Sequence, residues 1–195
     1  MKKAVIVIFD QFTDIDVFLP WDLLNRVKLI HPDFEVKILG TKSSHQSACG
    51  IHLPTHGNIS DCKDADLVFF ASGSGTRSLI IDQAYLNIFQ LDPKKQLICS
   101  MCSGALLIAA LGHLAGLSAT TYPTAFSALR ELGIEVEENT HLVVHDTIAT
   151  AAGCLAAVDL MGWAIAKLYN EKTKQAVIAS VLPIGQGQAC IYPTK

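Results

Sequence analysis

Residues 96–114 read QLICSMCSGALLIAALGHL, and this stretch decides the fold. Gln96–Ser100 is a short apolar run that is typical of a buried parallel strand, and Ala105–Leu114 is typical of a helix. Met101–Gly104 leaves so little chain between them that it must reverse direction in a sharp, strained turn. We therefore predict that the side chain of Cys102 is raised above the edge of the sheet.

A cysteine at this turn has the position of a nucleophile. The free backbone N–H groups and the dipole of the following helix favour an anion, so we expect a lowered pKa for the Cys102 thiol. Gly104 would let the turn pack closely against its neighbours. The alternative is that Cys102 is only a small buried residue, as cysteine often is. Open α/β sheets place their sites beyond the carboxyl ends of strands, which favours the nucleophile.

Outward from this turn, strand-like apolar runs alternate with segments of helical spacing. The alternation predicts a single domain over residues 1–195 with a doubly wound, mostly parallel α/β sheet and helices on both faces. Residues 41–65 are polar and are expected to form a hairpin or small flap, and the tail from Ile184 is expected to be irregular. Further strands are expected at Ala4–Phe9, Phe34–Leu39, Asp66–Ala71, Ala119–Thr121, His141–His145 and Thr147–Thr150, and further helices at Asp16–Ile30, Tyr85–Gln90, Thr124–Leu132, Leu155–Tyr169 and Glu171–Leu182.

The composition agrees with this architecture and limits the classes of partner that we expect. Half of the residues are hydrophobic and 17% are charged, which suits a sheet covered on both faces. The net charge is −3 and no basic stripe is present, so nucleic acid is not expected as a partner. The apolar runs are too short for a membrane span or a secretion signal, so we expect a cytoplasmic protein without membrane contact.

The chain has six cysteines, which we expect to be free thiols. With Cys99 on an extended strand, its Cα atom would lie roughly 9–10 Å from that of Cys102, too far for a disulfide. The pair also lacks the further ligands of a structural zinc site. The polar flap holds a second group whose spacings match no common metal site: His45, Cys49, His52 and His56.

The loop Ser72-Gly73-Ser74-Gly75 follows the strand expected at Asp66–Ala71, on the same edge as Cys102. Backbone N–H groups of Gly73 and Ser103 could therefore point into one space and stabilise a developing negative charge. An ordinary turn is the alternative. A dinucleotide site is disfavoured because the loop lacks a third glycine at the required offset.

Asp16 lies just beyond the first predicted strand, again at the carboxyl edge. Its apolar neighbours make it a candidate for a buried carboxyl group. The alternative is a helix N-cap, which Asp14 or Asp16 could provide. No histidine directly follows Cys102, although folding could bring one near it.

Three segments carry a resemblance to a known family: DVFLPWD at residues 16–22, ASGSGTR at 71–77 and CSGALLIAALGHLAG at 102–116. Over Val5 to about Pro183 the chain resembles the ThiJ/PfpI superfamily, which has a class I glutamine amidotransferase-like domain, and within it the isocyanide hydratase-like branch. The resemblance implies a flavodoxin-like fold, a homodimer and no metal or cofactor. It also implies Cys102 as nucleophile, Asp16 as its acidic partner, and Gly73 and Ser103 as oxyanion donors.

The activity that the resemblance implies is hydration of a small-molecule substrate. A thiolate attacks the isocyanide carbon to give a thioimidate, and water then releases an N-substituted formamide. Asp16 would share one proton with Cys102 and protonate the substrate carbon. Ser103 stands where the peptidase branch has histidine, which argues against a peptidase.

Three expected pocket residues depart from the branch pattern, so the resemblance leaves the substrate open. Ser72 replaces a loop glycine, Tyr122 stands at a usual histidine, and Cys154 replaces isoleucine or a similar residue. The alternative function is that of a non-catalytic stress or redox-sensing protein. In that case Cys102 would be oxidised to a sulfinate.

Overall fold

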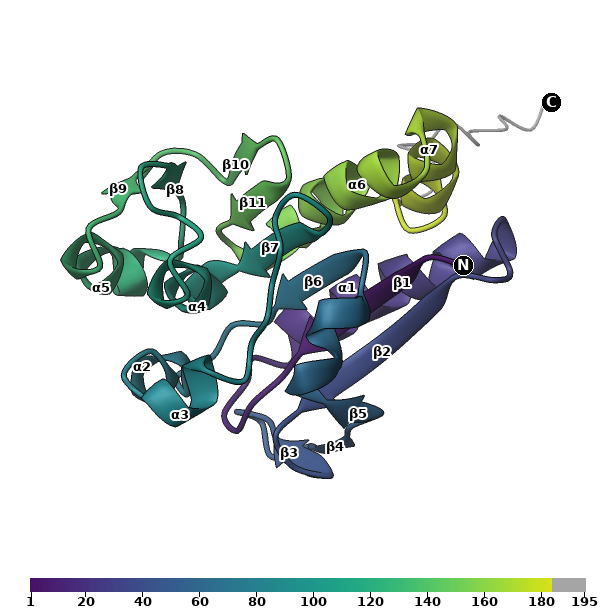
Figure 1. Cartoon of the computed structure of the whole chain (residues 1–195). Helices are drawn as coiled ribbons and strands as arrows, with labels where there is room; N and C mark the ends of the chain where they lie inside the picture. Colours follow the sequence, from purple (N-terminus) through teal and green to yellow (C-terminus); the bar gives the residue numbers. More distant parts are fainter. Residues whose placement is uncertain (184–195) are drawn as a thin grey trace, which may run out of the picture.

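The computed structural model describes residues 1–183, and a seven-stranded sheet forms its centre (Figure 1). The strand order is β10-β11-β7-β6-β1-β2-β5, and all neighbouring pairs are parallel except the β10–β11 hairpin. The predicted doubly wound, flavodoxin-like α/β sheet is therefore confirmed. The strands are β1 (Lys3–Val7), β2 (Glu35–Gly40), β5 (Gly57–Asn58), β6 (Leu67–Phe70), β7 (Leu97–Met101), β10 (Leu142–His145) and β11 (Ile148–Ala151).

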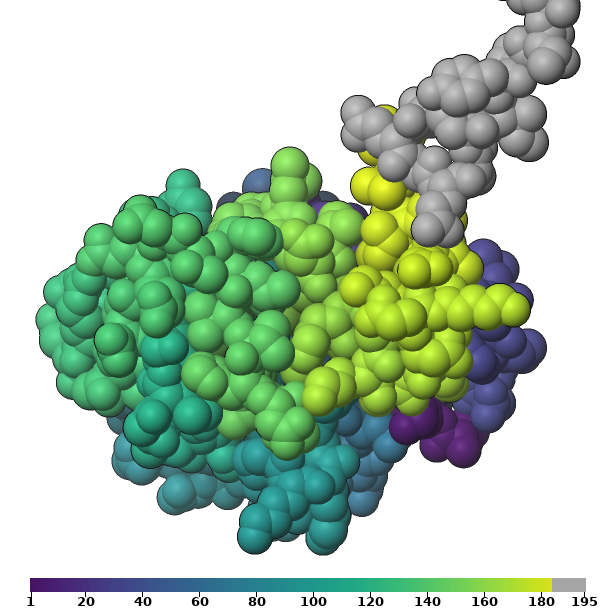
Figure 2. All heavy atoms as spheres, turned by 90° about the horizontal axis from the view of Figure 1, so that it is seen from above, coloured from purple at the N-terminus to yellow at the C-terminus, as the bar shows by residue number. Residues whose placement is uncertain are grey.

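Helices cover both faces of the sheet, which explains why the central strands are apolar without alternation. Every residue of β6, β7 and β11 is buried. One layer consists of α1 (Ile15–Arg26), α6 (Ala157–Leu168) and α7 (Glu171–Ala179), which pack against one another. In the other, α4 (Ala105–Ala110) packs with α2 (Thr76–Leu79) and α5 (Phe126–Glu131). Seen from above, α6 and α7 (yellow-green to yellow) lie beside the green β10–β11 region (Figure 2).

Short 3-10 turns complete the helical structure at Val27–Leu29, Ile59–Asp64, Cys102–Gly104, Pro123–Ala125 and Cys154–Ala156. None of the helices in residues 1–183 is long and apolar enough to cross a lipid bilayer.

The structure differs from the sequence prediction in its short elements. The helix expected at Tyr85–Gln90 starts earlier and is shorter. It is a single turn, α3 (Gln83–Leu86), which begins at the Asp82 cap and buries Tyr85 and Leu86. The strand expected at Ala119–Thr121 is only β8 (Ser118–Ala119), which pairs with β9 (Glu135–Val136) outside the main sheet. The prediction for the tail from Ile184 lies outside the described residues.

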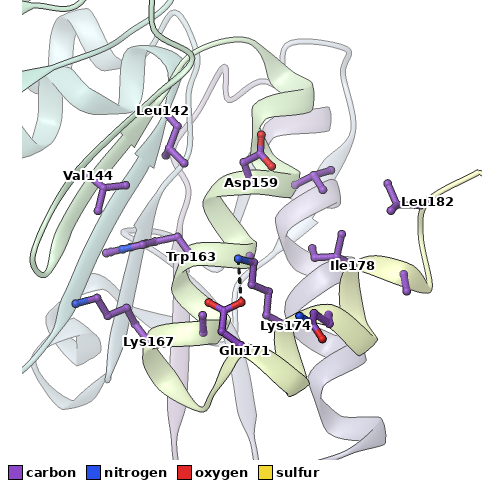
Figure 3. A pocket seen from close by; sticks show the side chains of 14 residues that line it. Leu142, Val144, Asp159, Trp163, Lys167, Glu171, Lys174, Ile178 and Leu182 are labelled. Carbon is purple, nitrogen blue, oxygen red and sulfur yellow. Dashed lines mark ion pairs between the residues drawn. The ribbon is translucent and has the colours of Figure 1, made fainter. Parts of the chain in front are cut away.

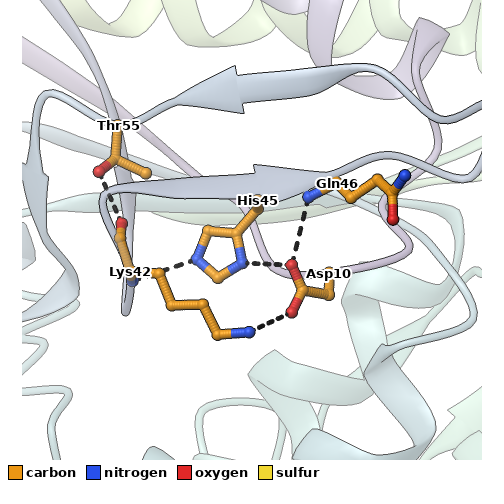
Figure 4. A network of polar contacts seen from close by, with 5 residues as sticks. All are labelled: Asp10, Lys42, His45, Gln46 and Thr55. Carbon is orange, nitrogen blue, oxygen red and sulfur yellow. Dashed lines mark hydrogen bonds and ion pairs between the residues drawn. The ribbon is translucent and has the colours of Figure 1, made fainter.

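The predicted flap is an antiparallel hairpin of β3 (Ser44–Gln46) and β4 (His52–Pro54), and one carboxylate ties it to the end of β1 (Figure 4). Asp10 accepts hydrogen bonds from Lys42 Nζ at 2.5 Å and from the Gln46 amide at 3.2 Å. The Lys42 contact, together with those of His45 and the Gln46 amide, lowers the pKa of Asp10 to about 2.

His45 belongs to the same network (Figure 4). Its Nε2 accepts from the Lys42 amide at 3.4 Å, so Nδ1 carries the hydrogen and donates to Asp10 at 3.0 Å. His56 accepts from the Ile38 amide through Nδ1 at 3.0 Å. These imidazoles therefore hold the flap in place.

Gly104 presses the turn at Cys102 against the neighbouring strand β6. A Cβ atom at this position would lie 2.6 Å from the carbonyl oxygen of Phe70 and 2.7 Å from that of Ala71. Both are backbone atoms of the sheet, which cannot move aside cheaply. The predicted close packing of the turn is confirmed.

We expect Gly104→Ala to lower the free energy of unfolding by about 1–3 kcal/mol, because the added methyl group overpacks the turn. Urea denaturation monitored by fluorescence measures this. Gly162→Ala is the matched control. A Cβ atom there would meet no backbone atom within 4 Å, only the flexible side chain of Lys174 at 3.3 Å and that of Ile178 at 3.8 Å. Alanine also favours the helix by up to about 1 kcal/mol. Equal loss of stability in both variants would contradict the packing described here.

Candidate active site

Four neighbouring strands, β11, β7, β6 and β1, end at one edge of the sheet, and each is followed by a segment of the candidate site. Cys154 follows β11, Cys102 follows β7, Ser72 and Gly73 follow β6, and Asp16 lies on α1 after β1. These segments surround a cavity of about 400 Å³. All the site residues predicted from the sequence line it: Asp16, Ser72, Gly73, Cys102, Ser103, Tyr122 and Cys154.

Cys102 has a strained backbone, as the short turn predicts. Its φ is 45°, and Gln11 is the only other non-glycine residue with a positive φ in residues 1–183. Such a conformation costs on the order of 1–3 kcal/mol and persists only where neighbours enforce it. Thr121 Oγ1 donates to the Cys102 carbonyl oxygen at 2.7 Å, and Gly104 fixes the other side. The turn therefore holds the sulfur at the cavity.

Asp16 is a buried carboxyl group, and the N-cap alternative is wrong for it. Helix α1 begins at Ile15 with Asp14 at the N-cap, and Asp16 lies in the first turn with 1% of its surface exposed. Ser72 Oγ donates to Asp16 Oδ2 at 2.5 Å. The Thr13 amide donates to the Ser72 carbonyl oxygen at 2.8 Å, which joins the loop to the start of α1. The other carboxylate oxygen, Oδ1, has no hydrogen-bond partner.

The Asp16 carboxylate lies close to two thiols. A carboxylate oxygen of Asp16 and the sulfur atoms of Cys102 and Cys154 all lie within 4.8 Å of one another. Among the described residues, this is the group whose donor atoms come close enough to share a metal ion.

The surroundings of Cys102 favour the neutral thiol. Burial raises its pKa well above the ordinary value, the negative charge of Asp16 raises it further, and the backbone N–H of Gly153 acts in the opposite direction. Burial and, to a smaller extent, contact with the Asp16 carboxylate raise the pKa of Cys154 to about 11.

The lowered pKa that we predicted for Cys102 is therefore wrong. Helix α4 has only six residues and starts after a 3-10 turn, so its dipole is outweighed by burial and by the adjacent carboxylate.

The side chain of Ser103 binds the loop after β6 to the turn at Cys102, a role that the sequence did not indicate. Ser103 Oγ accepts from the Gly73 amide at 3.0 Å and also lies 3.1 Å from the Gly73 carbonyl oxygen as a donor. The Gly73 N–H would thus have to exchange this partner for a substrate atom to act as an oxyanion donor. Only glycine fits at position 73, because its φ is 152° and a Cβ atom would lie 2.1 Å from the Gln11 carbonyl oxygen.

The structure adds polar residues that sequence reasoning missed. Arg77 brings a positive charge to the cavity, and its Nη2 donates to the Thr124 carbonyl oxygen at 3.0 Å. Its position two residues after the Ser72–Gly75 loop was the signal that could have identified it. Tyr122, which was predicted from the sequence, is 49% exposed at the same cavity. The other additions are Thr13, Ser74 and Thr124.

A larger groove of about 630 Å³ lies elsewhere, between β10 and the helices α6 and α7 (Figure 3). Its walls are mostly apolar, with Leu142, Trp163 and Ile178 among them, and the Lys174–Glu171 ion pair spans 3.2 Å within it. The described residues that line it include no cysteine. The smaller cavity at Cys102 is therefore the better candidate for chemistry.

Comparison with known proteins places this chain in a family. A sequence profile of the DJ-1/PfpI family matches residues 2–167. Isonitrile hydratase from Pseudomonas putida is 27% identical over 175 residues, covering 88% of this chain and 74% of that protein.

Solved structures agree on the fold. A THiJ/PfpI family protein from Pseudomonas syringae has a TM-score of 0.82 at 20% identity, covering 96% of this chain and 78% of that chain. DJ-1 from Schizosaccharomyces pombe has a TM-score of 0.77 at 16% identity, covering 94% of this chain and 100% of that chain. The resemblance noted in the sequence is thus confirmed: this chain belongs to the DJ-1/PfpI family.

Proposed function

We propose that this protein is a hydratase that uses Cys102 to convert isocyanides, or similar small electrophiles, to N-substituted formamides. The observation that carries the proposal is a nucleophile-type turn whose sulfur lies within 4.8 Å of a buried carboxylate, Asp16. The described lining of the cavity contains no histidine that could serve as the base. Isonitriles and isocyanides are the same functional group, so the likeness to isonitrile hydratase supports this chemistry.

The position of the proton defines the first step. In the resting site the sulfur of Cys102 keeps its hydrogen, because burial and the Asp16 charge disfavour a thiolate. As the sulfur attacks the terminal carbon of the isocyanide, its proton passes to the Asp16 carboxylate. Asp16 then delivers this proton to the same carbon, which completes a thioimidate bound to Cys102.

Water completes the reaction. It adds to the thioimidate carbon with Asp16 as base, and Asp16 passes the proton it takes from water to the substrate nitrogen. The carbon–sulfur bond then breaks, the proton of the added hydroxyl group goes to sulfur, and an N-substituted formamide leaves. Ser72 holds one oxygen of Asp16, so the other remains available for this proton relay. Backbone N–H groups of Gly73 and Ser103 are the proposed donors to the negative charge that develops on the substrate.

The second candidate is a stress or redox-sensing protein without turnover, in which Cys102 is oxidised to a sulfinate. The observation that favours it is that Cys102 lines a cavity and lies close to the Gly153 N–H, which acts in favour of an anion at its sulfur. Turnover separates the two candidates, because only the hydratase releases product.

We expect Cys102→Ala to abolish formamide production from aryl and alkyl isocyanides, because the variant lacks the sulfur that forms the thioimidate. Product is measured by liquid chromatography against authentic formamides. Cys49→Ser removes an exposed thiol that does not line the cavity and should leave the rate unchanged. If the unmodified protein turns over none of a broad panel of isocyanides, the hydratase proposal fails.

We expect Asp16→Asn to shift the alkylation of Cys102 by iodoacetamide to lower pH. Removing the carboxylate removes a negative charge that raises the thiol pKa, so more thiolate is present at any given pH. Formamide production should fall by about 100-fold or more, since the proton acceptor is lost. Peptide mass mapping across a pH series measures the alkylation of Cys102 and of Cys49 separately.

Asp14→Asn is the matched control for this shift. Asp14 raises the pKa of the exposed Cys49, so the control should move the alkylation profile of Cys49 and leave that of Cys102 in place. An unchanged Cys102 profile in Asp16→Asn would contradict the coupling between the thiol and the carboxylate.

A further inference from the structure

Cys154 is a second thiol at the candidate site, and the proposed hydration does not use it. Its sulfur lies within 4.8 Å of the Cys102 sulfur, and both residues line the same cavity. No other cysteine of residues 1–183 lines that cavity. We propose that Cys102 and Cys154 form a reversible disulfide when a hydroperoxide enters the cavity.

The two cysteines differ in their freedom to move. Cys102 is fixed by its strained backbone and by the Thr121 hydrogen bond. Cys154 is only partly buried and begins a 3-10 turn directly after Gly153, whose φ is 87°. The next side chain, Leu155, is 75% exposed, so packing does not clamp this segment. A disulfide needs a sulfur–sulfur distance of about 2.05 Å, and a movement of Cys154 toward Cys102 supplies the approach.

The reaction balances with one hydroperoxide. The Cys102 sulfur, having given its proton to Asp16 or water, attacks the peroxide, breaks the O–O bond and becomes a sulfenic acid, while the other oxygen leaves as an alcohol or water. The Cys154 thiol then attacks the Cys102 sulfur and expels one water molecule. Each sulfur loses one electron, and the peroxide gains two. Two equivalents of a low-molecular-weight thiol restore both cysteines by exchange.

The position of Cys154 decides between disulfide and sulfinate. A sulfenic acid is oxidised further only if a second peroxide molecule reaches it first. A thiol held within 4.8 Å competes as an intramolecular nucleophile and needs no second encounter. Cys154 thus makes the oxidation of Cys102 reversible. This inference needs no isocyanide chemistry, so it stands or falls separately from the hydratase proposal.

The test treats the purified full-length protein with hydrogen peroxide in the presence of a metal chelator. Free thiols are then alkylated, and intact and non-reduced peptide masses are measured. We expect the loss of two hydrogen masses, a linked pair of peptides containing Cys102 and Cys154, and full recovery of alkylation after reduction. The chelator removes any metal ion that could protect the thiols, so a loss of alkylation indicates a disulfide.

Variants complete the test. In Cys154→Ser, we expect the Cys102 peptide to gain two oxygens in place of the link, and Cys49→Ser should form the link as the unmodified protein does. Two results would overturn the inference in the unmodified protein: oxygen addition on Cys102 while Cys154 remains open to alkylation, or a link from Cys102 to any other cysteine. Both results are obtained with the unmodified protein, so neither depends on the stability of a variant.

Discussion

A cysteine with a φ of 45° stays in that conformation only while its neighbours enforce it. Here the enforcing contacts come from several parts of the fold. Strand β7 enters the turn fully buried, Gly104 lies against the β6 backbone, and Thr121 binds the Cys102 carbonyl oxygen. The geometry of the site therefore depends on the close packing of the sheet edge. A sulfur on a longer, relaxed loop would not be held toward Asp16 in this way.

Because the site is buried, the charge of the Cys102–Asp16 pair depends on a single proton. In water a thiolate and a carboxylate can coexist at modest cost, but in a buried site two negative charges within 4.8 Å repel strongly. In the function that we propose, the pair of Cys102 and Asp16 therefore keeps a proton that passes between sulfur and oxygen as charge develops. Ser72 contributes by holding one carboxylate oxygen and leaving the other free. The proposed acid–base chemistry thus needs no histidine, and it links the family's fold to the function that we propose.

The sequence predicted the parts of the site that depend on topology. The strands could be recognised as apolar runs because both faces of the sheet are covered. The turn at Cys102 could be predicted because the strand and the helix leave almost no residues between them. Asp16, Ser72 and Gly73 followed from the rule that parallel strands end at one edge. What failed depended on side-chain distances and on short elements. The pKa direction of Cys102 required knowing its burial and its separation from Asp16.

Other features were hidden for the same reason. The hydrogen bonds of Ser103 to Gly73 join residues that are 30 positions apart in the chain. The nearness of Cys154 to Cys102 depends on β11 lying beside β7. Spacing along the chain does not reveal it, and only the family resemblance placed Cys154 in the pocket. Turns such as α3, and the two-stranded pairing of β8 with β9, are too short for hydrophobic periodicity to identify.

Neutron diffraction from a deuterium-exchanged crystal at neutral pH tests the central claim most directly, because it locates the proton of the Cys102–Asp16 pair. The account predicts a deuterium atom on the sulfur of Cys102, within the site lined by Asp16 and Cys154. A bare Cys102 sulfur at neutral pH would contradict it, since the thiol would then be ionised despite its burial and its neighbouring carboxylate.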